Sequence, residues 1–297
     1  MVEYTISCHN GHTVRREHNR RNRKVTDREK HIRRDGYYET WLDIRPQDVY
    51  AELFGEAIAD YNYSQELSGH PERRIKDYYR KICDDKQKHP VYEMIVSVGN
   101  MTNHPSVATS RQILKEFFNS WSERNPNLIM IGAYFHADEA ADEETVYEKE
   151  GSTPHVHIDY IPVCHHQKRG PETQTALKKA LLEMGIEPGA TMKETAQIIW
   201  EHKQREYLEN LCTKHGLNIS HPKIEAVQHL DTKEYKQRKR ILRLQDEKNK
   251  IISELDNLEI RRQQLERDYQ SLEEDNLDLA QAMLYEDGQY NRGCKSR

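Results

Sequence analysis

A seven-residue repeat near the C-terminal end is the feature that most constrains how this chain can fold. Between about residues 235 and 285 an aliphatic side chain returns at every seventh position, and no Gly or Pro interrupts the run. The repeated residues are Leu244, Ile251, Leu258, Leu265, Leu272 and Leu279. Such a column is typical of the d positions of a coiled coil. We therefore expect a coiled-coil helix over 235–285, followed by a polar tail over 286–297.

The a positions of this repeat, three residues before each d position, indicate how the helix pairs. They are Ile241, Lys248, Leu255, Arg262, Tyr269 and Asn276. A polar Asn276 at an a position favours a two-stranded register, so we predict a parallel homodimer. A heteromeric contact and an intramolecular partner are the alternatives. A single solvated helix is a further alternative, but it does not require so regular a column of aliphatic residues.

The residues before the repeat, 1–225, are predicted to form one α+β domain. The whole chain has 35% hydrophobic and 32% charged residues, as expected when an elongated segment dilutes a smaller core. Apolar runs predict strands at 91–98, 128–136 and 155–163, and helical patterns occur at 47–61, 72–84, 110–123, 172–184 and 193–215. This order of elements predicts an antiparallel sheet with helices packed on one face.

The cellular compartment follows from the cysteines and from the absence of long apolar runs. The five cysteines are scattered without a Cys-x-x-Cys pair, which favours reduced thiols over a disulfide framework. The segment Cys164-His165-His166 follows a predicted strand, and we interpret it as a loop rather than as a metal site. No run approaches the length of a membrane span, and no signal peptide is evident, so we expect a cytoplasmic protein.

Two histidines in a predicted strand indicate a metal site. His155 and His157 are two residues apart, so on a strand they point to the same face. A second apolar run ends in His136, with Asp138 and Glu139 directly behind it. If the two runs pair as neighbouring strands, three histidines meet at one edge of a sheet, which suits a divalent metal. The simpler alternative is a pair of surface histidines.

These residues also resemble a known family. Residues 136–139 read His-x-Asp-Glu and residues 153–157 read Thr-Pro-His-x-His, which is similar to the HxDExTPHxH signature of the Mob/Pre family. This family comprises plasmid mobilisation relaxases, also called plasmid recombination enzymes, within the HUH endonucleases. Residues 18–21 read His-Asn-Arg-Arg and resemble the family's N-terminal HNxR motif, and the Tyr-rich residues 61–79 match more loosely. The resemblance spans about residues 15 to 162.

The chain departs from the family pattern at two places. Residues 140–152, which are mostly acidic, separate the Glu from the Thr-Pro, whereas the family usually has one residue there. A hairpin loop can absorb this insertion because the cost of loop closure grows only logarithmically. Where the family often carries an Asn-Tyr motif, residues 37–42 read Tyr-Tyr-Glu-Thr-Trp-Leu, so any role of that Asn cannot be carried over.

The resemblance implies a ferredoxin-like HUH core in which His136, His155 and His157 bind a divalent metal. Mn²⁺ or Mg²⁺ is implied, and the softness of imidazole favours Mn²⁺. Glu139 or Asp138 would orient a ligand histidine or accept a proton. In some members the histidine of HNxR attacks phosphorus, which here makes His18 the predicted nucleophile.

The remaining assignments implied by the resemblance concern other parts of the site. Arg21 would hold a phosphate. Most HUH relaxases use tyrosine, so Tyr78 and Tyr79 are rival nucleophiles. The simpler alternative is structural, because adjacent residues on a helix face different ways and one tyrosine would pack while the other is exposed.

A basic segment surrounds His18. Residues 15–34 hold ten arginines and lysines against three acidic residues, although the net charge of the chain is −5. Such a run is often just solvated, but beside a predicted nucleophile it favours DNA contacts by Asn19, Arg20, Arg23 and Lys24. We therefore predict a metal-dependent relaxase that nicks a plasmid transfer origin at a single strand or hairpin, forms a covalent intermediate and religates the strand. The alternatives are an impaired DNA-binding scaffold and a phosphodiesterase without a covalent intermediate.

Overall fold

The computed structural model describes residues 2–11, 14–29, 32–100, 103–139, 153–191, 193–221 and 232–293. The predicted acidic insertion, 140–152, lies outside the described residues. The chain divides into two compact units, Met1–Pro222 and Lys223–Arg297. Each unit is described by itself.

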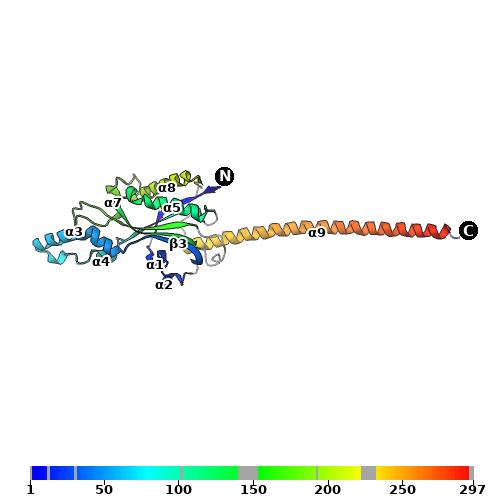
Figure 1. Ribbon diagram of the computed structural model, residues 1–297, viewed down its shortest axis with the longest axis horizontal. Helices are drawn as coiled ribbons and strands as arrows, with labels where there is room; N and C mark the ends of the chain where they lie inside the picture. The colour runs from blue at the N-terminus through cyan, green and yellow to red at the C-terminus, as the bar shows by residue number, and fades with distance from the viewer. Residues whose placement is uncertain are drawn as a thin grey trace. The chain divides into compact units, whose positions relative to one another are not determined.

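A five-stranded sheet forms the centre of the first unit (Figure 1). Its strands, in spatial order, are β2 (Ile6–Asn10), β4 (Tyr92–Val98), β6 (His155–Pro162), β5 (Leu128–Glu139) and β3 (Ile32–Asp43). All neighbouring strands in this sheet are antiparallel, which confirms the predicted antiparallel sheet. The sequence did not predict β2 or β3. A separate parallel pair joins β1 (Glu3–Tyr4) to β7 (Asn218–Ile219).

Alternation along the central strand β6 separates the apolar core from the site. Val156, Ile158 and Tyr160 are fully buried in the main hydrophobic core. His155, His157 and Asp159 point to the opposite face because side chains alternate along a strand. The period of two in this strand therefore places its polar residues together.

Helices cover both faces of the sheet. The main core packs beneath α5 (Val107–Asn119), α7 (Leu177–Glu183) and α8 (Ala196–Lys214), with α6 (Trp121–Arg124) beside them. On the other face, α3 (Pro46–Leu67) and α4 (Tyr78–Cys83) form a second core cluster with Ile131 and Ile161. The short helices α1 (Arg16–Asn19) and α2 (Arg23–Thr26) also lie opposite α5 and α8 (Figure 1).

The prediction of helices on one face is therefore wrong, although the mixture of helices and an antiparallel sheet is confirmed. The apolar residues Ile131 and Ile161 point away from the main core and need their own cover. The predicted helix at 72–84 is also shorter than expected. A 3₁₀ turn at Pro71–Arg73 is followed by extended backbone at Arg74, and α4 begins only after the cap at Asp77, whose side chain accepts from the Arg80 amide.

The four cysteines among the described residues are free, as predicted. His165 and His166 are exposed and pair with Glu183 and Glu172, so they lie in a loop outside any metal cluster among the described residues. None of the described helices is both long and apolar enough to cross a membrane.

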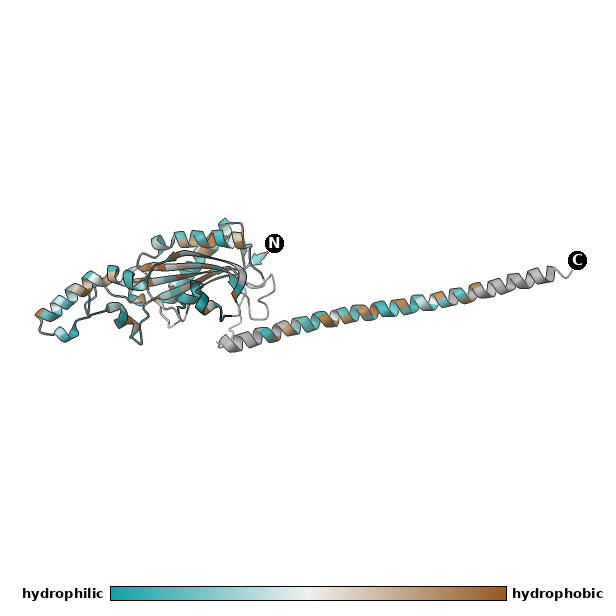
Figure 2. Cartoon of the chain, turned by 60° about the horizontal axis from the view of Figure 1, so that its bottom comes forward, coloured by the Kyte–Doolittle hydropathy of each residue, from teal (hydrophilic) through white to brown (hydrophobic). Residues whose placement is uncertain are grey.

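The second unit contains one long helix, α9 (Thr232–Gly293), of 62 residues. It includes the predicted 235–285 and continues through 286–293 of the predicted tail, and residues 294–297 lie outside the described residues. The extension is reasonable because no Pro occurs there. Hydrophobic residues recur along α9 between hydrophilic ones (Figure 2). Those of the d column are exposed in the single chain.

Candidate metal centre and active site

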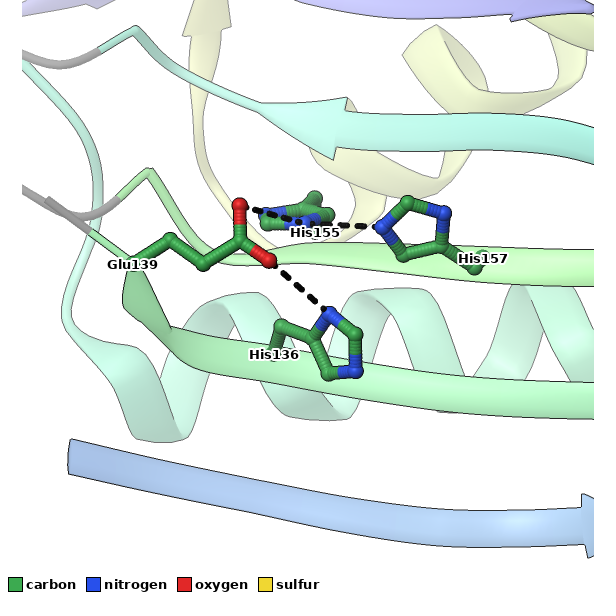
Figure 3. Close-up of side chains that lie close together, drawn as sticks. All are labelled: His136, Glu139, His155 and His157. Atoms are coloured by element: carbon green, nitrogen blue, oxygen red, sulfur yellow. Dashed lines mark hydrogen bonds and ion pairs between the residues drawn. The ribbon is translucent and has the colours of Figure 1, made fainter. Parts of the chain in front are cut away.

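Three histidines and one glutamate meet at the ends of two neighbouring strands (Figure 3). His136 and Glu139 come from β5, and His155 and His157 come from β6. The pairing register sets His136 directly opposite His155. One potential ligand atom from each of the four residues lies within 4.8 Å of the others. The structure thus brings the three predicted metal histidines together and adds Glu139 to them.

The outer nitrogen of each imidazole is held by an oxygen acceptor. His136 Nε2 lies 2.8 Å from the Asn19 carbonyl oxygen, and His155 Nδ1 lies 2.8 Å from the Thr153 carbonyl oxygen. A carbonyl oxygen can only accept, so these ring nitrogens carry the proton. The other nitrogens, His136 Nδ1 and His155 Nε2, then present lone pairs to the cluster.

His157 is fixed in the same way by a buried carboxylate. Its Nδ1 lies 3.0 Å from Glu93 Oε1, and Asn19 Nδ2 donates to the same oxygen at 2.6 Å. His157 Nε2 therefore faces the cluster, only 3.1 Å from His155 Nε2. Two lone pairs this close are unfavourable unless a cation lies between them or a proton is shared. His136 Nδ1 is likewise buried and lies 3.4 Å from Glu139 Oε1, without a hydrogen bond among the described residues (Figure 3).

The charge states of these groups suit a divalent cation. Burial lowers the pKa of His136 well below its ordinary value and also lowers the pKa of His155, so both imidazoles are neutral. Burial would raise the pKa of Glu139, but His155, His136 and His18 outweigh it and hold that pKa well below its usual range. Neutral imidazoles with one carboxylate form a donor set that fits a transition-type divalent ion.

His18 lies beside this cluster. Its Nδ1 is 2.5 Å from Glu29 Oε2, and its Nε2 is 3.0 Å from Glu139 Oε1. Its ring centroid is 6.1 Å from that of His136 and 6.3 Å from that of His157. Burial would lower the pKa of His18, but hydrogen bonds to Glu139 and Glu29 outweigh burial and raise it. The predicted nucleophile is thus oriented by one carboxylate on each ring nitrogen.

Arg21 is buried and positions carboxylates, which differs from the predicted phosphate contact. Its Nε and Nη2 donate to Asp138 at 2.7 and 2.5 Å, and Nη2 also donates to Glu139 at 2.7 Å. The backbone at Arg21 is in the left-handed region, with φ 55°, and this turns the side chain inward. Its guanidinium holds Glu139 in place between His18 and the metal histidines.

The four residues predicted to contact DNA fall into two groups. Asn19 is buried, and its side chain holds Glu93, so its direct DNA contact stays a prediction that this position does not favour. Arg20 donates to Asp43 Oδ1 at 2.7 and 3.0 Å and is already paired. Arg23 and Lys24, on α2, are exposed and are the members of the set open to a phosphate.

The rival tyrosines lie elsewhere. Tyr78 is buried in the second core cluster, where its hydroxyl accepts from the Thr175 amide, and burial raises its pKa to about 12. Tyr79 is half-buried and lines a cavity of about 740 Å³ together with His18 and Arg16. Burial also raises the pKa of Tyr79. A raised phenol pKa disfavours the phenolate that would attack phosphorus.

Sequence reasoning missed Glu29 and Glu93 and gave Asp159 no role. Glu93 is the one acidic residue in the apolar run 91–98, and that isolation is the only signal that could have found it. Asp159 lies opposite Glu93 in the register and is fully buried, and burial raises its pKa to about 7. The Nε of Arg16 lies 3.3 Å from Asp159 Oδ2.

A buried histidine and carboxylate cluster of this kind defines a candidate metal centre with a further histidine beside it. The family model described as plasmid recombination enzyme (Mob/Pre) matches residues 9–237. The chain belongs to this family, which confirms the resemblance found in the sequence. It is therefore a plasmid recombination or mobilisation protein of an enzyme family that acts on DNA. No curated protein and no solved structure matches the chain.

Replacing the cluster histidines should weaken metal binding. We expect His136→Ala, His155→Ala and His157→Ala each to lower Mn²⁺ affinity at least about tenfold, because even partners outside the ligand set contribute that much. Isothermal titration calorimetry measures the change. The matched control is the double variant His165→Ala/His166→Ala, which removes two exposed histidines outside the cluster. Equal Mn²⁺ affinity in the wild type and the three cluster variants would rule out this metal site.

Proposed function

We propose that this protein is a metal-dependent relaxase that acts on plasmid DNA in the cytoplasm. It would nick one strand at a transfer origin, presented as a single strand or hairpin, hold the 5′ end covalently and religate it. The observation that carries the proposal is the contact of His18 Nε2 with Glu139, which is also a member of the histidine cluster. Membership of the plasmid recombination enzyme family supports it.

The topology supports a ferredoxin-like HUH core within residues 1–225. The segment β4-α5-β5-β6-α8 follows the β-α-β-β-α order of that fold, and β6 lies between β4 and β5 in the sheet. Strand β2, from the start of the chain, occupies the edge next to β4 where the fourth strand of that fold would lie. The two histidines of the Thr-Pro-His-x-His segment are then on the central strand.

His136, His155, His157 and Glu139 are the residues that would hold the metal ion. A divalent ion there, Mn²⁺ in preference to Mg²⁺ because of the imidazole ligands, supplies Lewis acidity toward the non-bridging oxygens of the scissile phosphate. The remaining chemistry belongs to the side chains around it.

His18 acts as the nucleophile through Nε2. The Nε2–P bond forms while the bond from phosphorus to the 3′ oxygen breaks, and that oxygen takes up the proton that Glu139 removes from Nε2. Glu29, on Nδ1, keeps the imidazole oriented and stabilises the positive charge that develops on it. Glu139 Oε1 accepts the Nε2 proton as the lone pair turns to phosphorus, and Arg21 holds this carboxylate in position. Religation is the same step in reverse.

The covalent intermediate is the decisive test. Supercoiled plasmid carrying the DNA upstream of this gene is incubated with the protein and Mn²⁺, and the reaction is stopped with SDS. We expect open-circular DNA and a DNA-linked peptide that mass spectrometry maps to His18. Digestion above neutral pH preserves the acid-labile P–N bond. An adduct on Tyr78 or Tyr79 would keep the function and overturn the assignment of the nucleophile.

Matched variants sharpen this test. His18→Ala should abolish the adduct and keep Mn²⁺ binding, whereas Tyr79→Phe should keep both. The two rival functions predict other results. Metal binding and phosphodiester hydrolysis without an adduct would favour the phosphodiesterase, and DNA binding without cleavage under any metal would favour the impaired scaffold.

DNA contacts of the basic segment should appear in the salt dependence of binding. Each phosphate contact on a single strand contributes about 0.7 to the slope of log affinity against log salt. The double variant Arg23→Ala/Lys24→Ala should therefore flatten the slope by about 1.4. Arg20→Ala should change the slope less, because Asp43 already neutralises that guanidinium. Fluorescence anisotropy with a labelled single strand at several salt concentrations measures the slope, and an unchanged slope in the double variant contradicts the DNA contact.

We further propose that α9 pairs with the same helix of a second copy as a parallel coiled coil. Its d residues Leu258 and Leu265 are 63% and 62% exposed in the single chain. A continuous aliphatic column of this kind becomes buried when two helices supercoil.

The dimer can be tested with substitutions on and off the seam. Leu258→Lys/Leu265→Lys should convert the protein to a monomer of 35.2 kDa, because charges would replace the apolar seam. Ile260→Lys is a matched control, since Ile260 is 63% exposed but lies at the outer f position. Size-exclusion chromatography with light scattering gives the mass. A monomeric wild type, or a dimer in both variants, would refute this pairing.

A further inference from the structure

One row of cross-strand neighbours links the metal centre to the edge of the sheet. Tyr38 on β3 is paired with His136 on β5, and His136 is paired with His155 on β6. Directly paired residues of antiparallel strands project from the same face, with Cβ atoms about 4.5–5.5 Å apart. Tyr38 therefore stands next to a metal histidine, on the same face, and β3 is the outermost strand on that side.

The ring of Tyr38 is open to a ligand. Its side chain is 49% exposed, although it adjoins one of the most buried histidines of the protein. Among the described residues, its hydroxyl has no hydrogen-bond partner and its ring no aromatic contact. The exposed ring of Tyr38 beside the histidine cluster therefore offers a flat apolar surface that has no evident role in packing.

The adjacent tyrosine shows the contrast. Tyr37 is 43% exposed, but it points to the other face, where its hydroxyl donates to Glu39 and its ring contacts Phe135 at 6.0 Å. Tyr37 thus belongs to the side covered by α5, whose Arg111 pairs with Glu39. Two neighbouring tyrosines of similar exposure therefore differ mainly in which face they occupy.

We propose that Tyr38 is a stacking platform for a base next to the scissile phosphate. This inference rests on the proposed relaxase function. If a phosphate is held at the histidine cluster, the base next to it lies about one side chain's length from the cluster. This is about the separation of the neighbouring residues His136 and Tyr38. Bases of a single strand stack on exposed aromatic rings, and such stacking tolerates any sequence because every base has a π face. The partner is therefore an unpaired nucleotide of DNA.

The test separates base contacts from phosphate contacts. Labelled oligothymidylate and an abasic oligomer of the same length carry the same phosphates, and only the first has bases. Affinities are measured by anisotropy with Mn²⁺ on a His18→Ala background, so that the cluster can hold a phosphate and no strand is cut. Tyr38→Ala should reduce the preference for oligothymidylate over the abasic oligomer by about tenfold, within the ~5- to ~150-fold range expected for one stacked base. Tyr38→Phe should keep the preference, and Tyr37→Ala should leave it unchanged.

Each outcome has one meaning. The Mn²⁺ affinity and the unfolding midpoint of Tyr38→Ala should equal those of the wild type. If Tyr38 had only a structural role, the loss of base preference would be accompanied by a change in one of these two quantities. An unchanged preference in Tyr38→Ala, with a His18 adduct still formed, overturns this inference and leaves the relaxase proposal intact. A wild type that binds neither oligomer and forms no adduct overturns both.

Discussion

Asn19 is the residue on which the geometry of the whole site depends. Its carbonyl oxygen fixes the outer nitrogen of His136, and its side chain holds Glu93, which in turn fixes His157. The same turn of chain places His18 against Glu139. A single buried residue therefore orients two histidines of the cluster and locates the fourth imidazole. This explains physically why a His-Asn pair near the start of the chain belongs with histidines more than a hundred residues later.

The site carries more carboxylates than cationic side chains among the described residues. Glu29, Glu93, Asp138 and Glu139 gather around the histidines, and Arg21 is the buried cation that faces them most directly. A phosphodiester approaching these carboxylates would be repelled. A divalent ion offsets much of this negative charge, and such ions are commonly the largest charge in sites of this kind. Electrostatics therefore supports the same conclusion as the orientation of the imidazole lone pairs.

The sequence predicted those parts of the site that obey a local period. His155 and His157 share a face because a strand has a period of two, and His136 joins them through the pairing of two apolar runs. Glu29 and Glu93 were missed because their contacts depend on register and on a turn, which no local pattern encodes. The inward position of Asn19 was not predicted because a basic run does not say which of its members turn inward. The helices on both faces were missed for a similar reason, since Ile131 and Ile161 reveal their orientation only in the folded sheet.

The proposal of His18 over the tyrosines rests on reach rather than on residue type. His18 Nε2 is 3.0 Å from Glu139, a member of the metal cluster, and so it already adjoins the place where a phosphate would be held. The Tyr78 hydroxyl is occupied by the Thr175 amide inside the second core cluster. Tyr79 borders the cavity that His18 also lines, but no contact among the described residues joins it to the cluster. These contacts favour His18 over either tyrosine as the proposed nucleophile.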